Sequence, residues 1–558
     1  MAEQLYIVFV MSATSVPLQN LRSRSILPRA RPAPDTAGFL RARIAKIGEP
    51  LPDPANVQGD VYLLFPKIAE GFLFFWIDDA DGFKAALRQY KPTSSADVES
   101  DLQAISDAKG RGQIANVVQS QIAFSRAGLN KLGRLEAVGD IRFDGGSMRR
   151  DKTDLGDGRQ WDAIFDSGTV DGVFIIAAPD AAQRFKAAQT IKGQFGSAVG
   201  RFRQIDADRR TGENNKHEHF GYRDGVSQPA IRGLTEAHTG QLQCDPGVIL
   251  MGYKGDPVFD NTDPKVPKRP AWTKDGTFMV FRKLEQDVKG FRDYCKTNAS
   301  RWKDFWPSGT VGKDLTENEG ADLWGARMIG RWKSGCPIDL SPYRDNPNIA
   351  GNLDQVNNFD YSVQYETFPS QIRCPFVAHT RKTAPRNLDP FVDKKFLESA
   401  LIIRAGMPYG RDYDVAPEDQ NRGLAFVCYS SSITNGFYRQ TVDFANNNYF
   451  PHATFTPERH GQDPILGGPG DLFDTTLVGK SALQPDQKNE DLVIDREATL
   501  RITSKAGQDV RVSGFVKKED LSFKEDFFVT SRGGEYFFVP SIDTMREFAS
   551  GTTRSKDP

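Results

Sequence analysis

The sequence predicts an α+β fold in which helices cover one face of an antiparallel sheet. Short apolar runs typical of strands alternate with segments of helical periodicity, the turns between them are tight, and the same succession occurs twice along the 558 residues. Short strands joined by tight turns favour antiparallel pairing, with the helices packed on one side. We therefore expect two similar halves joined near residue 225.

The first half contains the elements of one such unit. Apolar and aromatic runs predict its strands, and Ser94 and Ser95 are candidate N-caps of its second helix. The expected strands are 61–66, 72–77, 121–125 and 172–177, and the expected helices are 79–90, 95–108 and 180–195.

The second half repeats the pattern. Its expected strands are 248–253, 277–282, 401–404, 423–429, 500–503 and 535–539, and its expected helices are 287–299, 317–332 and 436–446. A stretch rich in Gly, Asp and Pro, 465–495, is expected to be a surface loop. The predicted division of the chain is a Pro- and Arg-rich leader, expected to be disordered, an N-terminal domain and a C-terminal domain, at 1–50, 51–225 and 226–558.

Charge and cysteine content exclude several classes of function. Lys plus Arg total 72 and Asp plus Glu total 73, and this balance argues against a nucleic-acid or anionic-membrane partner, which requires a basic excess. The five cysteines form no CxxC pair, so neither a zinc site nor a dense disulfide framework is indicated. We expect a soluble globular protein, and the sequence does not indicate its oligomeric state.

The first 50 residues leave the compartment open. Leu5–Val10 is an apolar run, but the residues before it include the acidic Glu3 and no basic residue, so it makes a poor signal peptide. Residues 17–46 are Arg-rich, as in some transit peptides, and a disordered basic leader explains them equally well. No run reaches the roughly 20 apolar residues that a membrane helix requires. An intracellular location is favoured, with secretion left open.

The chain contains only six histidines, so any metal site ligated by histidine must use one or more of these six residues. His217 and His219, two positions apart, share a face only on a strand, so polar surface is the better interpretation than a metal pair. His379 follows an apolar run and is followed by three bases in CPFVAHTRKTAPR. Heme needs an axial imidazole and cations for its two propionates, although a lone histidine after an apolar run is more often part of the core.

Two further segments carry charged residues in unusual settings. Asp224 lies between the glycines of GYRDG, where it either caps a turn or is held over a cofactor that the backbone approaches closely. Arg404 ends the apolar run ALIIR, where it either reaches solvent or faces an anionic group inside the protein.

These segments resemble a known family. GYRDGVSQP resembles the GxxDG signature of dye-decolorizing peroxidases, which are heme enzymes. CPFVAHTRKTAPR resembles the segment with that family's proximal histidine, and LIIRAGMPYG the segment with its distal arginine. ANVQGDVYLLFP, GARMIGRWKSGCPI and GGEYFFVPS are also similar to family segments. The six matches follow the family's order over about residues 55–545, most closely to the larger fungal-type members, and leave 1–50 outside.

The resemblance implies two ferredoxin-like halves with antiparallel sheets, similar to a dimeric α+β barrel, with one heme b per chain in the C-terminal half. It implies that His379 is the axial iron ligand, Asp224 the distal acid–base residue and Arg404 the distal cation. The resemblance further implies that Arg381 pairs with a propionate and that Leu424 and Phe426 are apolar residues of the distal side. It also implies that the carboxylate of Asp463 accepts the other N–H of the axial imidazole.

The implied activity is reduction of hydrogen peroxide with one-electron oxidation of bulky dyes and phenols. The alternative is a heme carrier or iron-release protein on the same fold, which would not need the distal pair of Asp224 and Arg404. Bulky donors need a surface residue that relays electrons. Phe444 stands where the fungal-type relatives have a tryptophan, whereas Tyr409 matches a redox tyrosine of the family, so we expect any long-range route to use Tyr409.

Overall fold

The computed structural model of the chain describes residues 50–157, 161–166, 169–305, 314–361, 373–388, 392–447, 450–451, 463–466, 502–503, 509–510 and 528–550. The leader expected at 1–50 and the loop expected at 465–495 lie almost entirely outside these residues. In the part of the chain that is described, no helix has the length and apolar character needed to cross a bilayer.

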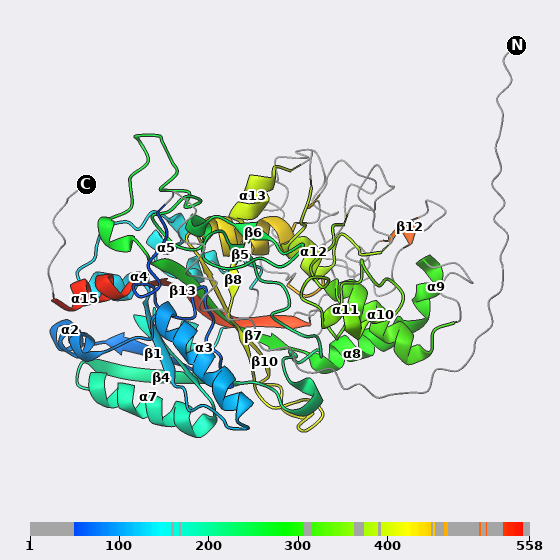
Figure 1. Cartoon of the computed structure of the whole chain (residues 1–558), viewed down its shortest axis with the longest axis horizontal. Coiled ribbons are helices and arrows are strands. Elements are labelled where there is room, and N and C mark those ends of the chain that lie inside the picture. Colours follow the sequence, from blue (N-terminus) through cyan, green and yellow to red (C-terminus); the bar gives the residue numbers. More distant parts are fainter. Residues whose placement is uncertain are drawn as a thin grey trace, which may run out of the picture.

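Nine strands form one sheet in the order β4-β1-β3-β2-β13-β7-β10-β8, with β9 paired to β10 (Figure 1). The strand order β4-β1-β3-β2 of the first half matches the order β13-β7-β10-β8 of the second. In both, the fourth strand of the half along the chain lies at one end, followed by the first, the third and the second. All neighbours pair antiparallel, and the halves are joined by the pair Phe124 and Phe538 of β2 and β13. The prediction of two ferredoxin-like halves is confirmed, although backbone pairing does not close the sheet into a barrel.

The first half packs helices against β1 to β4, and Figure 1 shows α2 and α7 against this part of the sheet. Ser94 caps α3 as predicted, with a capping box completed by Asp97. The elements are β1 Ala69–Ile77, α2 Ala80–Gln89, α3 Ser95–Gly110, β2 Gln119–Phe124, α4 Arg126–Lys131, α5 Ile141–Asp144, α6 Ala163–Asp166, β3 Gly172–Ala178, α7 Ala181–Phe195 and β4 Val199–Asp208.

The second half has shorter helices and longer connections. Its main strands are β7 Thr277–Gln286, β8 Ile403–Arg404, β9 Met407–Tyr409, β10 Gly423–Ser430 and β13 Val529–Val539. The helices are α8 Val288–Thr297, α9 Trp302–Phe305, α10 Glu317–Ile329, α11 Pro347–Ala350, α12 His379–Thr383, α13 Lys394–Ser399, the π-helix η6 Thr434–Ala445 and α15 Ile542–Ser550. Two-residue strands pair outside the main sheet, namely β5 Ala230–Ile231 with β6 Gln243–Cys244, and β11 Ile502–Thr503 with β12 Asp509–Val510.

Several expected elements are wrong. The runs 61–66 and 248–253 are not strands but largely buried irregular segments. Asp60, just before the first run, and Gly252, within the second, have positive φ angles that extended strands do not adopt. Their apolar character reflects burial and not pairing, which periodicity cannot distinguish. The expected helix 436–446 is the π-helix η6. The strand β4 was not predicted, because it is a polar edge strand with few buried residues.

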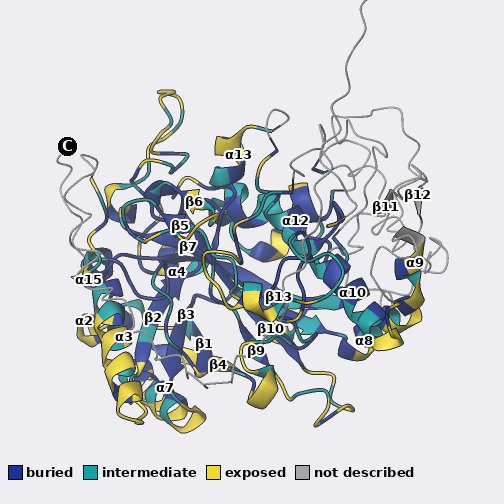
Figure 2. Cartoon of the chain, turned by 45° about the vertical axis from the view of Figure 1, so that its right-hand side comes forward, coloured by how far each residue is buried: buried dark blue, intermediate teal, exposed yellow. Residues whose placement is uncertain are grey.

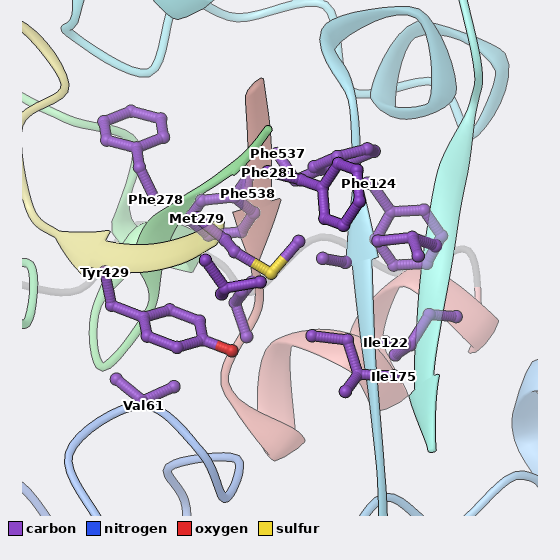
Figure 3. Close-up of a cluster of buried hydrophobic side chains, with 14 of the residues drawn as sticks. Val61, Ile122, Phe124, Ile175, Phe278, Met279, Phe281, Tyr429, Phe537 and Phe538 are labelled. Atoms are coloured by element: carbon purple, nitrogen blue, oxygen red, sulfur yellow. The ribbon is translucent and has the colours of Figure 1, made fainter. Parts of the chain in front are cut away.

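Aromatic side chains join the two halves. The rings of Phe72 and Phe74 in β1 lie 4.9 and 5.1 Å from that of Phe281 in β7, measured between centroids. Figure 3 shows Phe281, Phe537 and Phe538 of the second half beside Ile122, Phe124 and Ile175 of the first. Figure 2 shows the corresponding pattern of burial, with the sheet buried and the outer faces of α2, α3 and α7 exposed. Burial of such large apolar surfaces fixes the two halves against each other.

Candidate active site

A cavity of about 240 Å³ lies in the second half. Its walls come from β7 and β10, from α12 and η6, and from the loop that follows β4. Apolar and charged side chains both line it. The apolar lining includes Leu242, Leu284, Ile329, Ile402, Leu424, Phe426, Phe437 and Ile465, and the charged or ionisable lining includes Glu218, Asp224, Arg282, Arg331, His379, Arg386 and Arg404.

His379 is the first residue of α12 and lines this cavity. The buried residues 376–378 anchor the start of the helix. The Nδ1 of His379 donates to Oδ2 of Asp463 at 2.8 Å, and Asp463 is buried, with its other oxygen accepting the N–H of Ile465 at 2.7 Å. The carboxylate therefore fixes the tautomer and orientation of the imidazole, and Nε2 is the ring atom available to a metal.

Asp224 and Arg404 meet at the same cavity. Nη1 of Arg404 donates to Oδ1 of Asp224 at 3.1 Å, and Nη2 donates to the carbonyl of Ser227 at 2.8 Å. The glycines that flank this segment, Gly221 and Gly225, have φ of 98° and 71°, conformations that the Gly-Tyr-Arg-Asp-Gly sequence makes accessible. Both charged side chains are about one-third exposed, so the pair can contact a molecule in the cavity.

Leu424 and Phe426 both line the cavity, as their alternate positions on β10 require. Alternate residues of the neighbouring strand β7, from Arg282 to Gln286, line it too. This wall is thus one face of the sheet, and its side-chain order follows from strand periodicity alone.

Arg381 does not line the cavity. It is buried, donates to the carbonyl of Cys374, and lies over the rings of Tyr361 and Phe376, with its guanidinium carbon 4.6 and 4.3 Å from the centroids. The resemblance had assigned it to a propionate. This position does not support that assignment, because the guanidinium is held against two rings and a backbone carbonyl and Arg381 is not among the residues that line the cavity.

Among the other arginines that line the cavity are Arg331 and Arg386, and neither has a carboxylate within 4 Å among the described residues. Arg331 donates to the carbonyls of Gly335 and Val356 and to Oδ1 of Asn357, and burial lowers its pKa to about 10. Arg386 donates to three backbone carbonyls at 3.0 to 3.1 Å, and burial lowers its pKa as well. Arg331 is buried and Arg386 half-buried, and cations so far removed from solvent without an ion pair favour an anionic ligand.

The interpretation of the His217–His219 segment as polar surface is wrong for His219. Its side chain is 1% exposed and its Nε2 donates to the carbonyl of Tyr409 at 2.8 Å. Burial lowers the pKa of His219 to about 4, so it stays neutral in the folded protein. Glu218, which lines the cavity, accepts the N–H groups of Phe220 and Tyr222, and burial raises its pKa. This side chain shapes the loop that carries Asp224, a role that sequence reasoning missed.

The two residues considered for long-range electron transfer are both buried. Tyr409 is 3% exposed, does not line the cavity, and its hydroxyl has no hydrogen-bond partner among the described residues. The ammonium of Lys283 lies 5.1 Å from the centroid of its ring. Phe444 is 2% exposed and stacks on Phe450 at 4.0 Å, beside a second cavity of about 260 Å³. Neither ring is therefore a surface residue.

The residues at the main cavity fit heme. They provide one imidazole held by a buried carboxylate, apolar walls on β10 and η6, and two arginines suited to carboxylate groups, of which Arg331 is buried and Arg386 half-buried. An imidazole ligand in the same cavity as a carboxylate–guanidinium pair defines a class of protein, the heme-dependent oxidoreductases that act on peroxide.

Comparisons with known proteins identify the family. Residues 56–211 match the DyP dimeric alpha+beta barrel domain. A dye-decolorizing peroxidase of Exidia glandulosa is 34% identical and is matched over 88% of this chain and 86% of its own length. The structure of an ancestral D-type dye-decolorizing peroxidase gives a TM-score of 0.73 at 34% identity, over 89% of this chain and 99% of that one. A dye-decolorizing peroxidase in complex with 2,6-dimethoxyphenol gives 0.69 at 32% identity, over 89% and 100%. The chain belongs to the dye-decolorizing peroxidase family.

Proposed function

We propose that this chain binds one heme b through His379 and reduces hydrogen peroxide with Asp224 and Arg404, while oxidising aromatic donors in one-electron steps. The observation that carries the proposal is the meeting of these three side chains at one cavity, with Asp224 and Arg404 in direct contact. The proposed domains remain 51–225 and 226–558, with every one of these residues except Asp224 in the second.

When bound, heme supplies the redox-active iron that takes up the oxidising equivalents of peroxide. The carboxylate of Asp224 accepts a proton from one peroxide oxygen and returns it to the other, which leaves as water. The guanidinium of Arg404 stabilises the negative charge that develops as the oxygen–oxygen bond breaks. Their contact of 3.1 Å keeps the carboxylate and the cation aimed at the same part of the cavity.

On the side of His379, the hydrogen bond to Asp463 increases the electron donation of the imidazole. The cations of Arg331 and Arg386 would hold the propionates, the role that the resemblance had given to Arg381. Leu424 and Phe426 exclude water from the wall of the cavity formed by β10. A relative binds 2,6-dimethoxyphenol, and substituted phenols of this size are the donors we expect here.

Replacement of the proposed base tests this function. Asp224→Asn should retain the heme absorption spectrum yet lower kcat/KM for hydrogen peroxide by roughly 10²- to 10⁴-fold, because the amide cannot accept the proton. The activity of the unmodified protein should be highest in acid, where a carboxylate is still ionised and an imidazole base is already protonated. An unimpaired Asp224→Asn variant, or an optimum near pH 8, would assign the proton transfer to another group.

The alternative of a heme carrier or iron-release protein is not favoured by any feature of the cavity. Such a protein needs the axial ligand but no acid–base residue, whereas the carboxylate and guanidinium here are held together by a dedicated loop. The same measurement distinguishes the two functions, because a carrier would show no dependence of peroxide turnover on Asp224.

A further inference from the structure

The backbone of Arg404 is held by a side chain from the loop that carries Asp224. The N–H of Arg404 donates to Oε1 of Gln228 at 3.1 Å, and Nε2 of Gln228 donates to the carbonyl of the same residue. A glutamine amide thus pairs with both backbone groups of one residue, as a neighbouring strand would. Arg404 needs such a partner because, among the described residues, β8 pairs only with β10 and no strand lies on its other edge.

The neighbouring contacts make this clamp rigid. Gln241 donates to the carbonyl of Gln228 at 2.8 Å, which fixes the backbone from which the clamp extends. On the residue that follows β8, Ala405, the buried ammonium of Lys67 donates to the carbonyl at 2.8 Å. The loop also holds the other end of Arg404, since Asp224 and Ser227 both accept from its guanidinium.

We propose that Gln228 is a positioning residue for peroxide reduction, which fixes the backbone of Arg404 so that its guanidinium stays on Asp224. This inference rests on the proposed function. An arginine side chain is long and has many rotamers, so a small displacement of its backbone moves the guanidinium by a larger distance. Small displacements of catalytic groups lower rates substantially. Gln228 therefore acts through Arg404 and does not itself need to contact peroxide.

The first half of the molecule contains the same device without a catalytic residue. The N–H of Ile122 donates to Oε1 of Gln58 at 2.9 Å, and Nε2 of Gln58 donates to the carbonyl of Ile122 at 3.1 Å. Ile122 lies on β2, which occupies the same place in the strand order as β8. There the clamped residue is part of the apolar core, and Nε2 of Gln58 also donates to the carbonyl of Pro540 at 2.8 Å. Gln58 therefore provides a control that loses a glutamine clamp, and one further hydrogen bond, away from the cavity.

The experiment compares Gln228→Met and Gln58→Met in the full-length, heme-loaded protein. Gln228→Met keeps the side-chain size and removes both hydrogen bonds. We expect kcat/KM for hydrogen peroxide to fall about tenfold, equal to about 1.4 kcal/mol. The dissociation constant of fluoride, an anion that binds ferric heme without turnover, should rise by about the same factor, while the KM of a phenol stays unchanged. Gln58→Met should lower Tm and leave both values per heme unchanged.

A double-mutant cycle separates positioning from a general structural role. In an Arg404→Ala background, Gln228→Met should change kcat/KM and fluoride affinity by less than about twofold, because the side chain it positions is gone. The proposal is overturned if Gln228→Met matches the unmodified protein, or if it causes the same loss with and without Arg404. Should Gln228→Met lose heme, Gln228→Glu keeps the acceptor for the Arg404 N–H and should show a smaller loss of fluoride affinity. Failure of the proposed function would appear separately, as an unmodified protein that binds fluoride but does not turn over peroxide.

Discussion

The two halves of the molecule have the same strand order but cover their sheets differently. In the first half, α2 and α7 place Phe83 and Phe195 against the sheet, where these rings lie 5.2 and 4.9 Å from Phe75 and Phe174. In the second half, the five-residue helix α12 and the π-helix η6 stand at the cavity instead. One face is filled by stacked rings and the other is hollow.

The difference shows that the cavity arises from the helices packed on the sheet and not from the order of its strands. Short or irregular helices cannot lay a continuous row of side chains on a sheet, and π-helical turns are frequent at functional sites. A hollow interior loses the apolar contacts that stabilise a filled one. The second half should therefore depend on its cofactor for stability, whereas the first half should depend on its rings.

The largest expected effect tests this contrast with one substitution in each half. His379→Ala should lose heme, measured by its Soret absorption, and abolish the rise in Tm that heme binding gives, since a ligand stabilises only the state that binds it. Phe174→Ala should instead lower the free energy of unfolding by about 3–5 kcal/mol, through loss of a buried ring. The heme spectrum of its folded fraction should be normal.

The control for the first of these variants is His217→Ala, since His217 does not line the cavity and its imidazole forms a hydrogen bond with the carbonyl of the nearby Asn215. Its heme content should equal that of the unmodified protein. Normal heme binding by His379→Ala would contradict the assignment of the axial ligand. Loss of heme from folded Phe174→Ala would show that heme binding in the second half also depends on the ring packing of the first.

The sequence predicted the strands in which longer apolar runs are paired in the sheet, as in β1, β3 and β10, but not the three-residue strand β9. It did not predict β4, whose exposed residues make its pattern polar. The runs at 61–66 and 248–253 were misassigned because burial alone makes a segment apolar. Repetition of the pattern could be predicted, but the open path of the sheet could not, since register depends on contacts between distant segments.

For the candidate site, the motifs identified the side chains that meet at the cavity, including the contact of His379 with Asp463 over 84 positions. They did not distinguish which nearby arginines face it. Arg381 lies in α12, whereas Arg386 follows the helix with a positive φ of 62°, and spacing alone does not reveal which of the two faces the cavity. The clamp by Gln228 was also missed, although it lies within the matched segment GYRDGVSQP.

A second prediction concerns the seam between the halves, where His219 from the loop after β4 holds the carbonyl of Tyr409 in β9. Its pKa is lowered to about 4, below the reference value near 6.5 of an unfolded chain. As pH falls from about 6.5 to 4, the unfolded state gains a proton that the folded state does not, so stability decreases by about 2–3 kcal/mol. His219→Gln can still donate to the carbonyl but does not titrate.

Urea unfolding of both proteins at several pH values measures this effect. The stability advantage of the unmodified protein over His219→Gln should shrink as pH falls, while contributions from all other groups cancel in the difference. A difference that is constant between pH 7 and pH 4 would show that His219 is not held neutral. The contact between His219 and Tyr409 would then not limit the stability at low pH of an enzyme expected to work in acid.

The smallest expected effect concerns bulky donors. Tyr409 is buried, lacks a hydrogen-bond acceptor for its hydroxyl among the described residues, and has a cation near its ring, features that disfavour its oxidation. We therefore expect Tyr409→Phe to leave turnover of an anthraquinone dye nearly unchanged, contrary to the route expected from the sequence. Phe444→Trp should raise dye turnover by less than about tenfold, equal to about 1.4 kcal/mol in the barrier.

A small phenol serves as the control substrate, because it needs no relay and its turnover should be the same in all three proteins. A clear loss of dye turnover in Tyr409→Phe would restore the tyrosine route. No change in Phe444→Trp would indicate that dyes reach the cofactor by another path, such as the cavity beside Phe444.

The last helix, α15, has a consequence for synthesis of the chain. It packs on the first half, where the ring of Phe548 lies 6.2 Å from that of Phe124 and the guanidinium of Arg134 lies over it. The same ring lies 5.4 Å from Trp272 of the second half. The N–H of Ile542 donates to the carbonyl of Asn56. At typical elongation rates of about 5–20 residues per second, the ribosome releases β4 tens of seconds before this helix. During that time the apolar surface of the first half that α15 covers remains exposed to solvent, so we expect the nascent chain to bind chaperones. For the same reason we expect a chain truncated before residue 540 to aggregate.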